Sequence, residues 1–116
     1  MSDRILIVED EDALRYALSR ELEAAGYEVA QAHDYREALD VVEDGKKISL
    51  LVLDLVLPGV NGFALARMAR MKHPEVKIIY MTAFENIPMN EAHGPVLHKP
   101  VSPDVLLAAV RDRFRT

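Results

Sequence analysis

Five polar residues each stand at the end of a short apolar stretch, and together they could carry out phosphoryl chemistry. They are Glu9, Asp10, Asp54, Thr82 and Lys99. Three carboxylates gathered within a few ångströms repel one another, and a hard divalent cation relieves that repulsion by sharing their oxygens. Mg²⁺ suits such a set better than Zn²⁺, because every ligand is an oxygen and no histidine or cysteine belongs to the cluster.

Asp54 is the residue of this set best suited to act as a nucleophile. It ends the most hydrophobic stretch of the chain, so its carboxylate is expected to be fixed, partly desolvated and able to attack phosphorus. A cation on one side and Lys99 on the other would neutralise the oxygens of a transferring phosphoryl group. The Thr82 hydroxyl is placed to donate a hydrogen bond to one more of these oxygens. Asp54 is therefore the candidate phosphoacceptor.

Strand-like and helix-like segments alternate along the chain and would bring these residues together. Short β-rich runs without polar alternation are typical of strands buried on both faces. The predicted strands are 4–8, 27–32, 49–53, 76–81 and 96–98, and the predicted helices are 14–25, 34–44, 63–71 and 102–114, with a short helix within 84–94. This order predicts an α/β fold with one parallel sheet covered on both faces. Ligands in such sheets bind beyond the carboxyl ends of the strands, where the five polar residues stand.

The composition is that of one globular domain spanning residues 1–116. Half of the residues are hydrophobic and 28% are charged, which disfavours a disordered or fibrous protein. Cysteine is absent, so disulfides and thiolate metal sites are excluded, and a cytoplasmic location fits. The first apolar run is too short for a signal peptide or a membrane span. A net charge of −5 disfavours direct binding to nucleic acid, which needs a basic surface.

Five short motifs lie in order at the ends of the predicted strands. They are Val8-Glu9-Asp10, Leu51-Val52-Leu53-Asp54, Pro58-Gly59-Val60-Asn61-Gly62, Met81-Thr82-Ala83 and His98-Lys99-Pro100. Each motif alone is weak, but in this order they resemble the response regulator receiver family over essentially the full chain. The resemblance implies a flavodoxin-like (βα)5 doubly wound parallel sheet with strand order 2-1-3-4-5.

The resemblance also implies which residues bind the metal. Asp54 would be the phosphoacceptor and would share Mg²⁺ with Glu9 and Asp10. The backbone carbonyl of Val56 would supply a further oxygen ligand.

Two more residues receive roles from the resemblance. Thr82 would be the switch hydroxyl, Lys99 would contact the phosphoryl oxygens, and the Lys99-Pro100 peptide bond would be cis.

A sensor histidine kinase or histidine phosphotransfer protein would donate the phosphoryl group, and a downstream protein would recognise the changed surface. The chain is thus predicted to be a single-domain response regulator that can form a homodimer and contacts no membrane. It would catalyse nothing beyond its own phosphorylation and slow dephosphorylation.

The chain departs from the family pattern at three places. Val96 stands where the family usually has an aromatic residue, so the common threonine–aromatic switch is in doubt. The stretch from Thr82 to Lys99 is about one helical turn short of the usual spacing, which predicts a shortened fourth helix and a partner surface on the first or last helix instead. Val56 and Phe84 occupy positions that influence the attacking water in receivers, and neither side chain can hydrogen-bond water. Slow self-dephosphorylation is therefore predicted.

Two other functions compete with the signalling switch. A receiver-like docking module that is never phosphorylated is favoured by Val96 and the short fourth helix, but the intact set of Asp54, Thr82 and Lys99 argues against it. A phosphatase of the haloacid dehalogenase type also uses a strand-end aspartate with Mg²⁺. That family requires a second acid at the position of Val56, and a cap domain, so the phosphatase is disfavoured.

Overall fold

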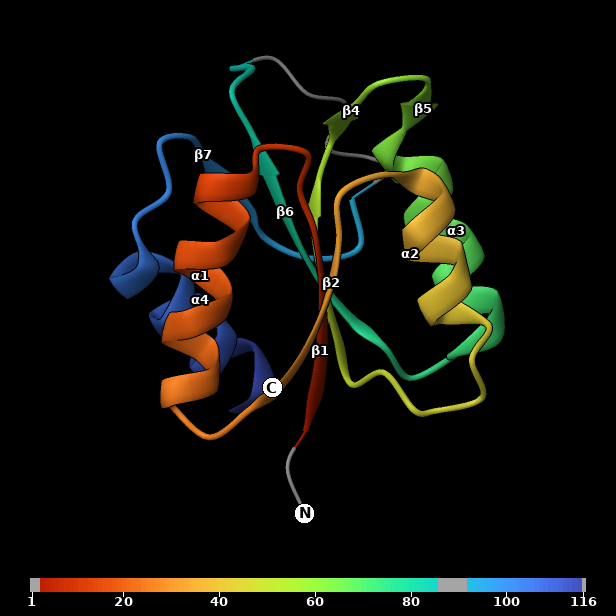
Figure 1. The fold of residues 1–116 in the computed structure, drawn as a ribbon, viewed down its shortest axis with the longest axis horizontal. Helices are drawn as coiled ribbons and strands as arrows, with labels where there is room; N and C mark the ends of the chain where they lie inside the picture. Colours follow the sequence, from red (N-terminus) through yellow and green to blue (C-terminus); the bar gives the residue numbers. More distant parts are fainter. Residues whose placement is uncertain (1–2, 86–91, 116) are drawn as a thin grey trace.

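The computed structural model describes residues 3–85 and 92–115 as a sheet between two helical layers (Figure 1). The sheet contains five strands, β1 (Arg4–Val8), β2 (Glu28–Ala32), β3 (Leu50–Asp54), β6 (Lys77–Thr82) and β7 (Val96–His98). Their spatial order is β2-β1-β3-β6-β7, and every neighbouring pair is parallel. When these five strands are numbered in chain order, this is the predicted order 2-1-3-4-5. The flavodoxin-like fold class is confirmed.

Helices cover both faces of the sheet, as the strand and helix pattern predicted. One layer contains α1 (Asp12–Ala24) and α4 (Pro103–Arg115), and the other contains α2 (Tyr35–Val42) and α3 (Gly62–Lys72) (Figure 1). The predicted short helix within 84–94 falls mainly on residues 86–91, which lie outside the described ranges. Within residues 3–85 and 92–115, no helix combines the length and the hydropathy that crossing a bilayer would require.

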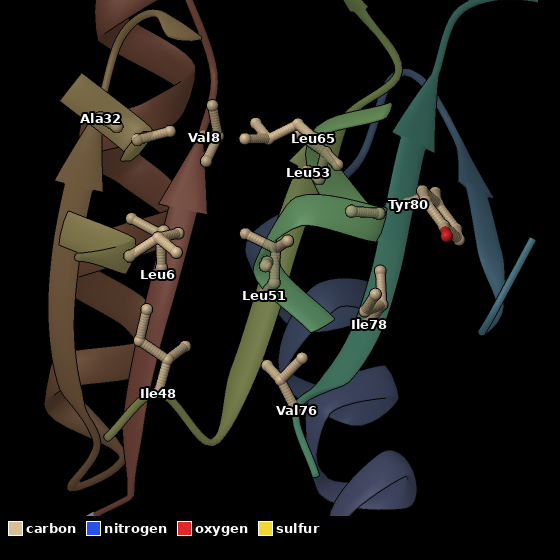
Figure 2. Close-up of a cluster of buried hydrophobic side chains, with 14 of the residues drawn as sticks. Leu6, Val8, Ala32, Ile48, Leu51, Leu53, Leu65, Val76, Ile78 and Tyr80 are labelled. Carbon is tan, nitrogen blue, oxygen red and sulfur yellow. The ribbon is translucent and has the colours of Figure 1, made fainter. Parts of the chain in front are cut away.

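The strands send alternate side chains into two separate cores, one under each helical layer. Leu51, Leu53 and Tyr80 belong to the core beneath α2 and α3 (Figure 2). Their neighbours along the strands, such as Val52 and Ile79, belong to the core beneath α1 and α4. All five are essentially inaccessible to solvent. Burial on both faces is why these strands are continuously apolar in sequence rather than alternating.

A short hairpin follows the third strand of the sheet, where the sequence predicted only a loop. It consists of β4 (Val56–Leu57) and β5 (Val60–Asn61), which pair in an antiparallel manner. Its turn is Pro58-Gly59, in which Gly59 has a φ of +78°, a conformation that glycine adopts without strain. Strands of two residues are too short to show a hydrophobic period. The sequence therefore indicated the turn but not the two strands that it connects.

The start of α2 is capped by its own side chains. Asp34 Oδ1 accepts a hydrogen bond from the Glu37 backbone N–H at 2.9 Å, and Glu37 Oε1 accepts one from the His33 backbone N–H at 2.9 Å. This reciprocal arrangement resembles a capping box. The Asp34 side chain satisfies the Glu37 N–H, a backbone donor that the helix itself leaves unpaired.

Replacing Asp34 with alanine is expected to lower the free energy of unfolding by about 1 kcal/mol, because the cap acceptor is lost. Urea unfolding followed by circular dichroism measures the change. Asp40→Ala, at an exposed position inside the same helix, is the control and should cost much less. Equal losses in the two variants would show that the cap contributes nothing specific.

Candidate functional site

The five predicted site residues converge at the carboxyl end of the sheet. Asp54 is the last residue of β3 and Thr82 is the last residue of β6. Lys99 follows β7, and its backbone N–H donates to the Thr82 carbonyl at 2.7 Å. Glu9 and Asp10 follow β1, which neighbours β3. Because all these strands run in the same direction, their carboxyl ends share one edge.

Asp54 is held by one hydrogen bond on each carboxylate oxygen. Oδ1 accepts from the Val56 backbone N–H at 2.9 Å, and Oδ2 accepts from Lys99 Nζ at 2.7 Å. The residue is 4% exposed. A buried carboxylate needs such partners to remain in place. The two bonds fix the orientation of the carboxylate and set a cation beside it.

Glu9 is a fully buried carboxylate beside the same lysine. Its Oε2 accepts a hydrogen bond from the Glu11 backbone N–H at 3.0 Å, and its Oε1 lies 2.6 Å from Lys99 Nζ as an ion pair. That contact does not meet hydrogen-bond geometry, which leaves Oε1 as a buried oxygen without a hydrogen-bond donor. Burial raises the pKa of Glu9, against the opposing effects of Lys99 and the Glu11 N–H. Lys99 is thus the cationic partner of an acid that burial makes harder to ionise.

Lys99 bridges the two buried carboxylates. Burial alone would lower its pKa, but the interactions with Asp54 and Glu9 outweigh burial and raise the pKa of Lys99 above its usual value. The ammonium group is therefore fully charged at neutral pH, within reach of any anion that approaches Asp54.

The donor set fits a hard divalent cation. Glu9, Asp10 and Asp54 each offer a carboxylate oxygen, and these oxygens lie within 4.8 Å of one another. Glu9 Oε1 accepts no hydrogen bond and lies 2.6 Å from Lys99 Nζ as an ion pair, so it keeps lone pairs that a cation could share. Oxygen-only sites of this kind favour Mg²⁺, Ca²⁺ or Mn²⁺. The role of the Val56 carbonyl as a further ligand stays a prediction.

Thr82 is buried at the edge of the cluster, and its hydroxyl oxygen accepts a hydrogen bond from the Phe84 backbone N–H at 3.0 Å. Val96, at which the sequence departs from the pattern of the family that it resembles, pairs in register with Tyr80. The Tyr80 ring is fully buried and packs edge-on against Phe63, with the ring centroids 5.2 Å apart. The hydrogen bond from the Phe84 N–H to the Thr82 hydroxyl oxygen links Thr82 to the loop that follows β6.

Comparison with known proteins agrees with the fold and the motifs. The family model described as the response regulator receiver domain matches residues 5–111. The chain belongs to the response regulator receiver family. It is therefore a receiver domain of the kind used in two-component signalling, and the Lys99-Pro100 bond is cis, as the resemblance predicted.

Curated relatives of this receiver are longer signalling proteins. Response regulator MprA of Mycobacterium bovis (strain BCG / Pasteur 1173P2) is 34% identical over 120 residues, covering 99% of this chain and 52% of its own length. Sensor kinase CckA of Brucella abortus (strain 2308) is 35% identical over 118 residues, covering 96% of this chain and 12% of its own length. The receiver thus spans about half, or less, of these relatives.

Solved structures of other receivers superimpose closely on this chain. A CheY-like receiver domain protein from Methanospirillum hungatei JF-1 has a TM-score of 0.90 at 29% identity, covering 99% of this chain and 95% of its own. The receiver domain of the hybrid histidine kinase CckA has a TM-score of 0.83 at 35% identity, covering 95% of this chain and 97% of its own.

One residue of the receiver site was not predicted from the sequence. Arg15 is 5% exposed, and its Nη1 donates to the Glu9 backbone carbonyl at 2.8 Å. A signal was present, because Arg15 occupies the helical face that Leu18 and Leu22 fill with apolar side chains. A cation at an apolar position of an amphipathic helix indicates a buried acceptor nearby.

Proposed function

We propose that this receiver accepts a phosphoryl group on Asp54 in a Mg²⁺-dependent reaction and then signals through protein–protein contact. The donor would be a phosphohistidine of a sensor histidine kinase or of a histidine phosphotransfer protein. The sensor kinase CckA contains a segment related to this chain, which supports a kinase as the partner. The main supporting observation is the buried Asp54 carboxylate, held by the Val56 N–H and Lys99 Nζ beside two further acids.

The proposed step is an in-line displacement at phosphorus. An Asp54 oxygen forms a new bond to phosphorus while the bond from phosphorus to the donor imidazole nitrogen breaks. The electron pair of the broken bond goes to that nitrogen, which can then take up a proton. The Val56 N–H orients the carboxylate during the attack, because it holds Oδ1 in place. Positioning of this kind removes much of the entropic cost of the reaction.

Lys99 and Thr82 would stabilise the charge that develops on the phosphoryl oxygens. The Lys99 ammonium already lies at Asp54 Oδ2, so it needs to move little to reach an oxygen of the incoming group. The Thr82 oxygen accepts from the Phe84 N–H, which leaves the hydroxyl proton free to be donated. A rotation of Thr82 toward the phosphoryl group would release Phe84, and the signal would begin there.

Glu9, Asp10, Asp54 and the Val56 carbonyl would hold the Mg²⁺. When bound, Mg²⁺ supplies positive charge that neutralises the carboxylates and the phosphoryl oxygens. A response regulator from Burkholderia pseudomallei, solved with a phosphorylated aspartate and a calcium ion, supports this assignment. It has a TM-score of 0.83 at 27% identity, covering 93% of this chain and 66% of its own. We propose no catalytic activity toward other substrates.

Incubation with acetyl phosphate and Mg²⁺, followed by intact mass spectrometry, tests the proposal. A stable gain of one phosphoryl group, lost in Asp54→Ala and in the presence of EDTA, is the expected result. No adduct under saturating donor and Mg²⁺ would instead favour a docking module. Continuous release of phosphate without an adduct would favour a phosphatase.

The aspartyl phosphate is expected to decay slowly, because apolar side chains flank the site. Val56 is 48% exposed and Phe84 is 59% exposed, and neither can orient an attacking water by hydrogen bonding. Val56→Asn introduces an amide that can do so, and it should shorten the lifetime severalfold in a phosphate-release assay. Val105→Asn, at an exposed valine on α4, should leave the lifetime unchanged. Decay of the unmodified phosphoprotein within seconds would contradict this prediction.

A further inference from the structure

Arg15 is a buried cation that connects the loop after β1 with α1 and β2. Its Nη1 donates to the Glu9 carbonyl at 2.8 Å, its Nη2 to Asp12 Oδ1 at 2.7 Å and its Nε to Gln31 Oε1 at 3.2 Å. Its guanidinium carbon also lies 4.9 Å from the centre of the Tyr16 ring. Burying a guanidinium is costly unless its donors are satisfied. Here three separate acceptors hold the planar group in one orientation.

The Glu9 carbonyl belongs to the peptide unit that joins the two acidic residues of this loop. Glu9 points into the protein and is fully buried, whereas Asp10 is exposed. The rotation of the peptide between them decides where both carboxylates lie relative to Asp54. A hydrogen bond from a charged donor restrains that rotation more strongly than a neutral donor would.

We infer that Arg15 is a positioning residue that sets the affinity of this site for a divalent cation. The inference rests on the proposed function, because it takes Glu9 and Asp10 as metal ligands. Arg15 does not touch the reacting atoms. It fixes the peptide between the ligands, while Asp12 and Gln31 fix the guanidinium.

A positioning role predicts that loss of Arg15 lowers the affinity for the cation but leaves the phosphorylation rate at saturating cation unchanged. Without Arg15 the loop samples orientations in which the two carboxylates do not meet the cation together, so binding weakens. Once the cation is bound at saturation, the ligands are in place and the phosphorylation rate returns to its normal value. Loss of an outer contact to a metal ligand typically weakens binding by about 10-fold or more. A merely structural role would lower stability and leave the affinity of the folded protein unchanged.

The experiment titrates the intact chain with Mn²⁺ and measures free Mn²⁺ by electron paramagnetic resonance. Mn²⁺ accepts the same oxygen ligands as Mg²⁺, and the method suits a chain without tryptophan. Arg15→Met keeps the apolar stem and removes the charge, and Arg15→Lys keeps the charge without the planar fork. Arg20→Met, at an exposed arginine of the same helix, is the matched control. Circular dichroism establishes that each variant is folded at the assay temperature.

The expected result is an affinity about 10-fold weaker in Arg15→Met, intermediate in Arg15→Lys and unchanged in Arg20→Met. At saturating Mg²⁺, the acetyl phosphate reaction should run at the rate of the unmodified chain in all three. If Arg15→Met does not fold, Arg15→Lys decides, and an unchanged affinity in that variant would overturn the inference. Unchanged affinity in a folded Arg15→Met, or a rate that stays low at saturation, would also overturn it. Failure of the unmodified chain to bind Mn²⁺ would overturn the proposed metal site, and the inference with it.

Discussion

Replacing Lys99 with methionine is expected to slow phosphorylation of Asp54 by about 100-fold or more, while divalent cations bind at least as tightly as before. Lys99 Nζ lies 2.7 Å from Asp54 Oδ2 and 2.6 Å from Glu9 Oε1, so it faces both the nucleophile and a proposed metal ligand. Its removal takes away charge that stabilises the transferring phosphoryl group. The same removal frees two carboxylates whose mutual repulsion then favours a cation.

The two effects are measured separately at a temperature where the variant is folded. Intact mass over time gives the rate of phosphoryl gain at saturating acetyl phosphate and Mg²⁺, and a Mn²⁺ titration gives the affinity. Lys72→Met, at an exposed lysine at the end of α3, controls for the loss of a positive charge. A Lys99→Met protein that is phosphorylated at the normal rate would remove Lys99 from the mechanism. Loss of cation binding in parallel with the rate would show that Lys99 is needed to build the site.

The strand pattern predicted the sheet because burial on both faces leaves short, continuous apolar runs in the sequence. The run from Leu50 to Leu53 has no polar interruption, and the structure places it at the centre of the sheet with helices on either side. The convergence of Asp54 and Lys99 was predicted for the same reason, since parallel strands bring their carboxyl ends to one edge. The position of each residue at a strand end, together with its type, was enough to predict this convergence.

Contacts that depend on how deeply a side chain is buried and how it is rotated could not be predicted from the sequence. Nothing in the sequence shows that Glu9 is fully buried while Asp10 is exposed, because both follow β1 directly. The bond from Arg15 to the Glu9 carbonyl joins a helix face to a loop, and its geometry arises only when α1 packs on the sheet. The β4–β5 hairpin was missed because a pair of two-residue strands has no periodicity to detect.

Replacing Gly94 with alanine is expected to cost about 3 kcal/mol of folding free energy, because there is no room for the added carbon. A Cβ on Gly94 would lie 1.8 Å from the carbonyl oxygen of Ile78 and 2.9 Å from its carbonyl carbon. Both are backbone atoms of β6, so the clash can be relieved only by moving the chain that leads into β7. Gly45→Ala is the control, since Gly45 has a φ of +84° but nothing within 4 Å of a Cβ, and left-handed strain alone costs about 1–2 kcal/mol.

The same substitution tests how the fold supports the site. β7 ends one residue before Lys99, and the Tyr80 N–H donates to the Pro95 carbonyl at 2.9 Å where β7 begins beside β6. A displacement at Gly94 therefore shifts the strand that delivers the lysine to Asp54. We expect folded Gly94→Ala to be phosphorylated more slowly than Gly45→Ala at saturating Mg²⁺, in urea-free buffer where both retain their circular dichroism spectrum. Equal rates would mean that the Thr82 backbone contact holds Lys99 without help from the register of β7.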